Sequence, residues 1–232
     1  MKTAGIIGGV GPESTVAYYR LLIALYRAQK TDGSYPSIII NSIDLNRVVQ
    51  LITASRFADI TDYLALEVNK LANAGVDFGA ISANTPHVVF NDLRARSQIP
   101  LISIVETTCD AARELSMERV GLLGTRFTMQ GRFYREVFEK AGIDLVVPTL
   151  HEQEYIHDKY MNELVNGIFS PDTRTHFIKI AERLRIQGHI DGLILGGTEL
   201  PLLLKADDYE DLPLLDTTRL HVERIVQKLL QT

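Results

Sequence analysis

Two short segments carry polar side chains of the kinds that bind carboxylates and move protons. One reads Ser82-Ala83-Asn84-Thr85-Pro86-His87 and the other Gly196-Gly197-Thr198-Glu199-Leu200-Pro201, and each directly follows an apolar run. Hydroxyl and amide groups hydrogen-bond carboxylates, while an imidazole or a carboxylate can accept and return a proton. We therefore take His87 and Glu199 as candidate acid–base residues. The structural alternatives are a histidine hydrogen-bonded near a helix start, and a glutamate that orients Thr198 or caps a helix.

A glycine-rich loop, Gly8-Gly9-Val10-Gly11-Pro12-Glu13-Ser14-Thr15, joins the first apolar run to the first amphipathic stretch. Its glycines allow backbone N–H groups, those of Gly9 and Val10 among them, to approach an anion at a helix start. The loop is a poor nucleotide motif, because Ser14 stands where the Rossmann pattern needs its third glycine and no Gly-Lys-Ser/Thr ending follows. A plain tight turn and a cradle for a carboxylate or phosphate are both compatible with it. Ser14 or Thr15 is expected to cap the helix.

Short apolar runs alternate with amphipathic stretches along the chain, which predicts an α/β fold of mostly parallel sheets flanked by helices. The expected strands are residues 5–8, 37–41, 78–82, 101–104, 119–124, 144–147, 192–195 and 214–215. Ligands of parallel sheets bind at the carboxyl ends of the strands, which is where both polar segments are expected to lie.

The second half of the chain repeats the first at an offset of about 113 to 116 residues. Residues 4–8 resemble 120–124, residues 79–85 resemble 192–198, and residues 99–103 resemble 212–216. Such a duplication predicts two similar lobes related by a pseudo-twofold axis, with a ligand cleft between them. We expect residues 1–105 plus 209–232 to form the first lobe and residues 106–208 to form the second. The final helix then packs on the first lobe.

The composition excludes several other classes of protein. The 232 residues carry a formal charge of −5 with lysine and arginine dispersed, which argues against a nucleic-acid partner. No apolar stretch is long enough to cross a membrane, and the N-terminal residues do not resemble a signal peptide. The single cysteine, Cys109, excludes an intrachain disulfide and fits a reducing cytoplasm. The histidines are not spaced as a metal motif, so we expect no metal.

The two polar segments and the glycine loop together resemble the aspartate/glutamate racemase superfamily, and the resemblance covers essentially the whole chain. In those cofactor-independent amino-acid racemases the two motifs usually read Cys-Asn-Thr and Gly-Cys-Thr-Glu, and the cysteines flank the substrate α-carbon. Here the corresponding positions are Ala83 and Gly197. Inversion by proton transfer needs an acid and a base on opposite faces of the carbon, and neither residue can serve. Cys109 is interpreted as a buried packing residue, and Ser82 is a poor base without an activating partner.

The same resemblance implies a set of substrate-binding residues. Asn84, Thr85, Thr125 and Thr198 match positions that bind the α-carboxylate or α-amino group. Arg47 matches a loop arginine that grips a distal carboxylate in some members, although a solvated surface arginine is the alternative. A lysine of some relatives aligns with Val165, and Lys159 lies about two turns earlier. The resemblance further implies independence of pyridoxal phosphate, no cofactor, and a homodimer.

Three functional hypotheses follow. The first is a racemase-family enzyme that uses another acid–base set, such as His87 and Glu199, for racemisation or a related isomerase or lyase reaction. The second is a non-catalytic paralogue that binds a small amino acid or carboxylate. The third, a nucleotide-binding domain, depends on the glycine loop alone.

Overall fold

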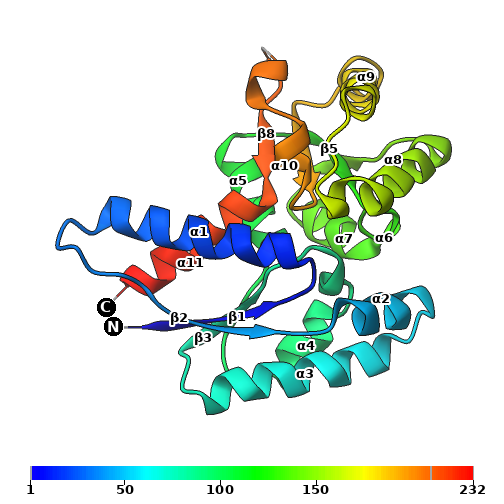
Figure 1. Ribbon diagram of the computed structural model, residues 1–232. Coiled ribbons are helices and arrows are strands. Elements are labelled where there is room, and N and C mark those ends of the chain that lie inside the picture. Colours follow the sequence, from blue (N-terminus) through cyan, green and yellow to red (C-terminus); the bar gives the residue numbers. More distant parts are fainter. Residues whose placement is uncertain (1, 210, 232) are drawn as a thin grey trace. The chain divides into compact units, whose positions relative to one another are not determined.

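The computed structural model describes residues 2–209 and 211–231, which form two compact α/β units (Figure 1). Unit 1 comprises the chain up to Ile104 together with the chain from Thr218 onward, and unit 2 comprises Val105–Thr217. The chain returns to unit 1 at Thr218, whereas the sequence predicts this return at residue 209. The reason is that β8 (Leu214–Asp216) pairs with β7 (Gly192–Gly196), which holds this strand in the sheet of unit 2.

Unit 1 is built on a parallel sheet of order β2-β1-β3-β4. In the register of this sheet, Ile6 lies opposite Ile40 and Ala80. Each strand falls where the sequence predicts one, and β3 and β4 end one and two residues earlier than expected. The bounds are β1 (Thr3–Gly8), β2 (Ser37–Ser42), β3 (Phe78–Ile81) and β4 (Leu101–Ile102).

The helices of unit 1 cover both faces of its sheet (Figure 1). On one face, α1 (Pro12–Gln29) and α11 (Thr217–Leu230) lie side by side and bury Tyr18, Leu22 and Tyr26 against Val222 and Ile225. The final helix therefore packs on the first unit, as predicted. The remaining helical segments are α2 (Leu45–Thr53), α3 (Phe57–Asn73), the 3₁₀ turn η1 (Thr85–Val89) and α4 (Phe90–Arg96).

Unit 2 repeats the same topology with the order β6-β5-β7-β8, again all parallel. Its strands are β5 (Arg119–Gly124), β6 (Asp144–Val146), β7 and β8. Its helical segments are α5 (Ile104–Glu114), α6 (Arg126–Gln130), α7 (Arg132–Lys140), α8 (Leu150–Asn162), η2 (Leu164–Asn166), α9 (Pro171–Gly188), α10 (Leu200–Leu203) and η3 (Ala206–Asp208). The matching strand order confirms the duplication predicted from the sequence.

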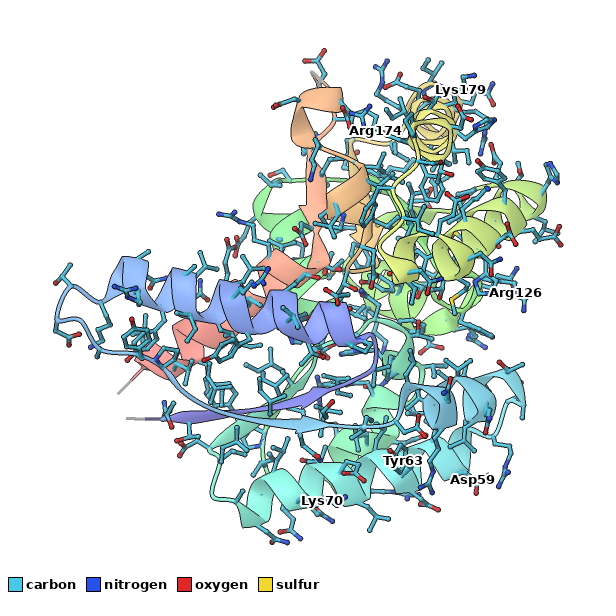
Figure 2. The ribbon with its side chains drawn as sticks, in the orientation of Figure 1. Asp59, Tyr63, Lys70, Arg126, Arg174 and Lys179 are labelled. Atoms are coloured by element: carbon cyan, nitrogen blue, oxygen red, sulfur yellow. The ribbon has the colours of Figure 1, made fainter. Side chains whose placement is uncertain are left out.

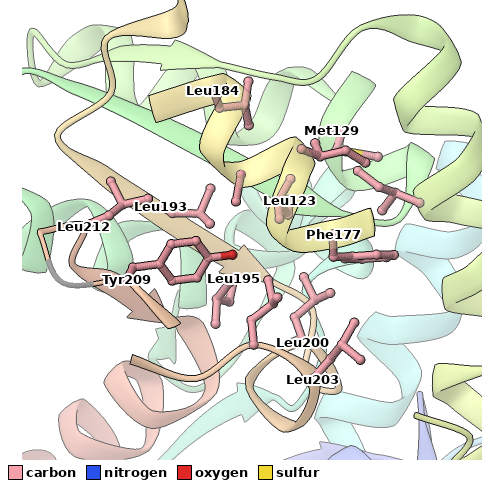
Figure 3. Packing of buried hydrophobic residues seen from close by; sticks show 14 of the residues in the cluster. Leu123, Met129, Phe177, Leu184, Leu193, Leu195, Leu200, Leu203, Tyr209 and Leu212 are labelled. Atoms are coloured by element: carbon pink, nitrogen blue, oxygen red, sulfur yellow. The ribbon is translucent and has the colours of Figure 1, made fainter. Parts of the chain in front are cut away.

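The core of unit 2 packs β5 and β7 against α8, α9 and α10. Leu123, Leu193 and Leu195 of the strands meet Phe177 and Leu200 of the helices, as Figure 3 shows. Helix α8 starts with a capping box, in which the side chains of Thr149 and Glu152 satisfy each other's backbone N–H groups. This packing fixes the side chains of α8 relative to the carboxyl end of β7, where the second polar segment begins.

Candidate functional site

The glycine loop after β1 is a tight turn whose first amide is already bonded. Gly9 and Gly11 have φ angles of 80° and 92°, and the Gly9 N–H donates to Thr15 Oγ1 at 2.8 Å. A side chain at Gly9 would meet the Ile43 backbone nitrogen at 2.7 Å. The predicted cap at Ser14 or Thr15 is wrong, because α1 begins at Pro12 with Gly11 as its N-cap residue. At Gly9 these contacts favour the tight-turn interpretation over an anion cradle, while Val10 is buried beside it.

The first polar segment begins at the carboxyl end of β3 and is joined to this loop. Ser82 Oγ donates to the Ile7 carbonyl at 3.1 Å and lies 3.4 Å from Thr15 Oγ1. Ala83 and Asn84 are buried, and Thr85, half-buried, starts η1. The structure thus brings the loop and the Ser82–Thr85 segment to the same edge of the unit 1 sheet.

His87 is a buried histidine with backbone partners on both ring nitrogens. Nδ1 lies 3.0 Å from the Ala83 carbonyl oxygen, and the Ile104 N–H donates to Nε2 at 3.2 Å. These partners require the neutral tautomer with the proton on Nδ1. Burial, then the neighbouring His221, lowers the pKa of His87 to about 3. The geometry favours the structural interpretation of His87 over acid–base catalysis.

A second buried histidine, which the sequence did not single out, extends this network. His221 of α11 lies with Nε2 3.1 Å from the Ile102 carbonyl oxygen and Nδ1 2.8 Å from Tyr18 Oη. Its ring centroid is 6.4 Å from that of His87, and burial lowers the pKa of His221 to about 4. The two imidazoles link α11 and η1 to the end of β4. Their position could not be anticipated, because His221 lies 134 residues from His87 in the sequence.

Arg47 lies on α2 of unit 1, which follows the carboxyl end of β2. It is the third residue of α2, whose N-cap residue Asp44 accepts from the Asn46 N–H, and its guanidinium stacks on Tyr63 of α3 at 4.1 Å from the ring centroid. Arg47, Tyr63 and Asp59 line an open hollow of about 540 Å³ between these helices, and Figure 2 labels the latter two side chains. The arginine is thus exposed but oriented by the Tyr63 ring, and it lines a concave surface.

At the carboxyl end of β5 in unit 2, Thr125 is the N-cap residue of α6. Its Oγ1 accepts from the Thr128 N–H at 3.3 Å and lies 3.2 Å from Thr128 Oγ1. The next amide, of Arg126, donates to His157 Nδ1 at 3.4 Å. The Thr125 hydroxyl therefore has a structural task at the edge where the resemblance places a substrate contact.

The second polar segment, at the carboxyl end of β7, forms a cluster with a tyrosine of α8. Tyr160 Oη donates to Glu199 Oε2, and Thr198 Oγ1 donates to the same oxygen at 2.8 Å. Tyr160 and Glu199 are 6% and 5% exposed. Burial, followed by the charge of Glu199, raises the pKa of Tyr160 well above its ordinary value. Glu199 thus orients Thr198, as one interpretation of the sequence predicts, and it also binds Tyr160, which no sequence motif singles out.

The remaining candidates have ordinary structural partners. Lys159 forms an ion pair with Glu163 at 2.5 Å, and Val165 packs against the unit 2 core. Cys109 is buried, its thiol lies 3.9 Å from the Val137 carbonyl oxygen, and burial raises its pKa. Across residues 2–209 and 211–231, no three His, Cys, Asp or Glu side chains gather as a metal site. In the same part of the chain, no helix has the length and apolar character needed to span a membrane.

Comparison with known proteins supplies the family. A family model described as "Asp/Glu/Hydantoin racemase" matches residues 7–225. The chain belongs to this family. It is 28% identical over 227 residues to the broad specificity amino-acid racemase RacX of Bacillus subtilis, covering 92% of both chains.

Two solved structures of similar proteins align with this chain over 100% of its length and 100% of theirs. One is a Yersinia pestis protein provisionally described as an Asp/Glu racemase, with a TM-score of 0.92 and 33% identity. The other is an aspartate racemase homologue from Pyrococcus horikoshii, with a TM-score of 0.87 and 32% identity. The glutamate racemase of Aquifex pyrophilus, at 22% identity and a TM-score of 0.67, shares the fold. The resemblance inferred from the motifs is therefore confirmed at the level of family and fold.

Proposed function

We propose that this Asp/Glu racemase family protein binds a small amino acid or carboxylate at the carboxyl ends of its parallel sheets. The observation that supports this most is the retained polar set at those ends, formed by Asn84 and Thr85 in unit 1 and by Thr125 and Thr198 in unit 2. Hydroxyl and amide groups at strand ends suit a carboxylate and an ammonium group. The similarity to the broad specificity amino-acid racemase RacX supports an amino acid as the ligand.

The usual two-thiol proton transfer is not part of this proposal, because the corresponding positions are Ala83 and Gly197. We assign His87 a positioning role, since both of its ring nitrogens are bonded to backbone groups. Glu199 is kept as the acid–base candidate. A non-catalytic binder is the alternative, and the structural partners of Thr125 and Glu199 are compatible with it.

Arg47 is proposed to select ligands with a distal carboxylate. Its guanidinium is held on the Tyr63 ring, and an arginine fork matches a carboxylate geometrically. The alternative for this residue is a stacking contact that stabilises α2 on α3. The proposal also includes a cytoplasmic location, independence of pyridoxal phosphate, no nucleic-acid partner and a homodimer, each carried over from the sequence and the family resemblance.

Ligand-observed proton NMR in D₂O tests the binding proposal. L- and D-aspartate, glutamate and a panel of other amino acids are titrated with the wild type, Thr198→Val and Thr175→Val, the last being an exposed control on α9. We expect line broadening of at least one ligand with the wild type and the control, and much less with Thr198→Val. Sharp ligand signals throughout, or equal broadening with all three proteins, would contradict the proposal.

A further inference from the structure

Tyr160 occupies the space that a side chain at position 197 would need. A Cβ atom built on Gly197 would lie 2.5 Å from Tyr160 Oη, 2.6 Å from Cε2 and 2.8 Å from Cζ. Such distances are far inside van der Waals contact. Position 197 is the one that the family resemblance assigns to a catalytic thiol. In this chain the group that fills the space beside Gly197 is the hydroxyl of Tyr160 on α8.

The hydroxyl is connected to a carboxylate. Tyr160 Oη donates to Glu199 Oε2, which also accepts from Thr198 Oγ1 at 2.8 Å. The phenol is protonated at neutral pH, and burial and the charge of Glu199 raise its pKa further above the ordinary value. A lone tyrosine in this state is a poor base. Bonded to a carboxylate, it can accept a proton while passing its own to the glutamate, which makes the two side chains one acid–base unit.

We propose that Tyr160, backed by Glu199, is the catalytic acid–base group of unit 2 and stands where the thiol is missing. The inference rests on the proposed binding of an amino acid at this strand end. In the forward step the Cα–H bond breaks and its electron pair stays on the substrate. The proton moves to Tyr160 Oη as the phenolic proton moves to Glu199 Oε2. The reverse step returns the proton on Tyr160 to the carbon and the proton on Glu199 to the phenol, and in D₂O exchange of the proton held by Tyr160 before this return delivers deuterium to the carbon instead.

Unit 1 offers no equivalent group at the corresponding strand end within the described residues. Position 83 is alanine, Ser82 Oγ donates to the Ile7 carbonyl, and both ring nitrogens of His87 contact backbone groups. Proton removal and return on one face of the carbon preserve its configuration. We therefore expect exchange of the α-proton to be faster than racemisation.

The test compares α-proton exchange and ligand binding in the same D₂O samples. Tyr160→Phe removes the hydroxyl while keeping the ring, and Glu199→Gln removes the basic oxygen while keeping an acceptor. Tyr155→Phe is the matched control, because Tyr155 lies on the same helix and its ring faces His176 and Phe177 instead. Circular dichroism verifies that each variant is folded.

We expect the first two variants to lower the exchange rate about 100-fold, the usual contribution of an acid–base residue, and the control to match the wild type. Dissociation constants should change by no more than about twofold, because the lost interaction acts in the transition state. Exchange by Tyr160→Phe at the wild-type rate would overturn the inference. If the wild type binds a ligand without exchanging its α-proton, the acid–base role of Tyr160 is overturned while the proposed ligand binding stands. If the wild type binds no ligand, both the acid–base role and the proposed function are overturned.

Discussion

Mild acid should destabilise unit 1 through His87 and His221. Both imidazoles are buried, at 2% and 0% exposure, and their folded pKa values are about 3 and about 4 against an ordinary value of 6.5. A depressed histidine pKa means that the unfolded chain binds protons more readily. Stability is therefore full above pH 6.5 and is lost progressively as the pH falls toward the folded values.

The size of the loss follows from these values. At pH 5 an unfolded histidine is almost fully protonated while both folded ones remain neutral, which costs about 2 kcal/mol for each side chain. The two together should lower the free energy of unfolding by about 4 kcal/mol between pH 7.5 and pH 5. Protonation of His221 and the charge of Arg94 would act on the pKa of His87 in the same direction as burial, while the backbone hydrogen bonds of Ala83 and Asn84 oppose it.

Urea unfolding at the two pH values measures this effect in the wild type, His221→Gln and His151→Asn, the last being an exposed control. His221→Gln should be less stable at pH 7.5, because Tyr18 and Ile102 lose their shared partner. Its further loss on going to pH 5 should be smaller than that of the wild type by about 2 kcal/mol. A pH dependence equal to that of the wild type would refute the assignment of neutral, buried imidazoles.

Three further outcomes are expected. Gly197→Ala should lower the free energy of unfolding by about 1 to 3 kcal/mol in urea titrations, because the added Cβ would overlap Tyr160. Gly188→Ala is the control and should be tolerated, because a Cβ at position 188 would have its nearest neighbouring atom at 3.4 Å. Equal losses of stability in the two variants would contradict the packing described. Cys109 should react slowly with a chromogenic disulfide until urea unfolds the chain, because it is buried and its pKa is raised, and rapid labelling of the folded protein would contradict this. Phe177→Ala should cost about 3 to 5 kcal/mol of stability by opening a cavity in the unit 2 core, and a loss below about 1 kcal/mol would show that the site collapses freely.

Much of the fold could be predicted because it depends on local patterns. Residues 119–124, an apolar run, form a strand with the predicted limits. The repeat aligns β7 and β8 with β3 and β4, and in the structure both pairs of strands are parallel neighbours. The boundary expected between residues 208 and 209 lies earlier than the division at Thr217 and Thr218, because it left residues 212–216 out of the second unit although the repeat aligns them with residues 99–103 of the first.

The candidate site was harder to predict because its important contacts join distant residues. Tyr160 lies 39 residues from Glu199 along the chain, and only the packing of α8 against β7 brings the hydroxyl to Gly197. The sequence shows that His87 is titratable and follows a strand end, but not that both of its ring nitrogens are hydrogen-bonded to the backbone groups of Ala83 and Ile104. Gly197, a glycine that the motif resemblance aligns with a cysteine, was a sequence signal that a larger side chain fills this space from elsewhere.

The chain leaves unit 1 after Ile104 and returns to it at Thr218, so unit 2 is an insertion of 113 residues within the polypeptide of unit 1. For α11 to dock on α1, the unfolded insertion would have to close a loop of that length, at an entropic cost of about 4 kcal/mol. A folded unit 2 holds its own two ends at a fixed separation and removes most of this cost. Substitutions deep in the core of unit 2 should therefore weaken the docking of the C-terminal helix on α1.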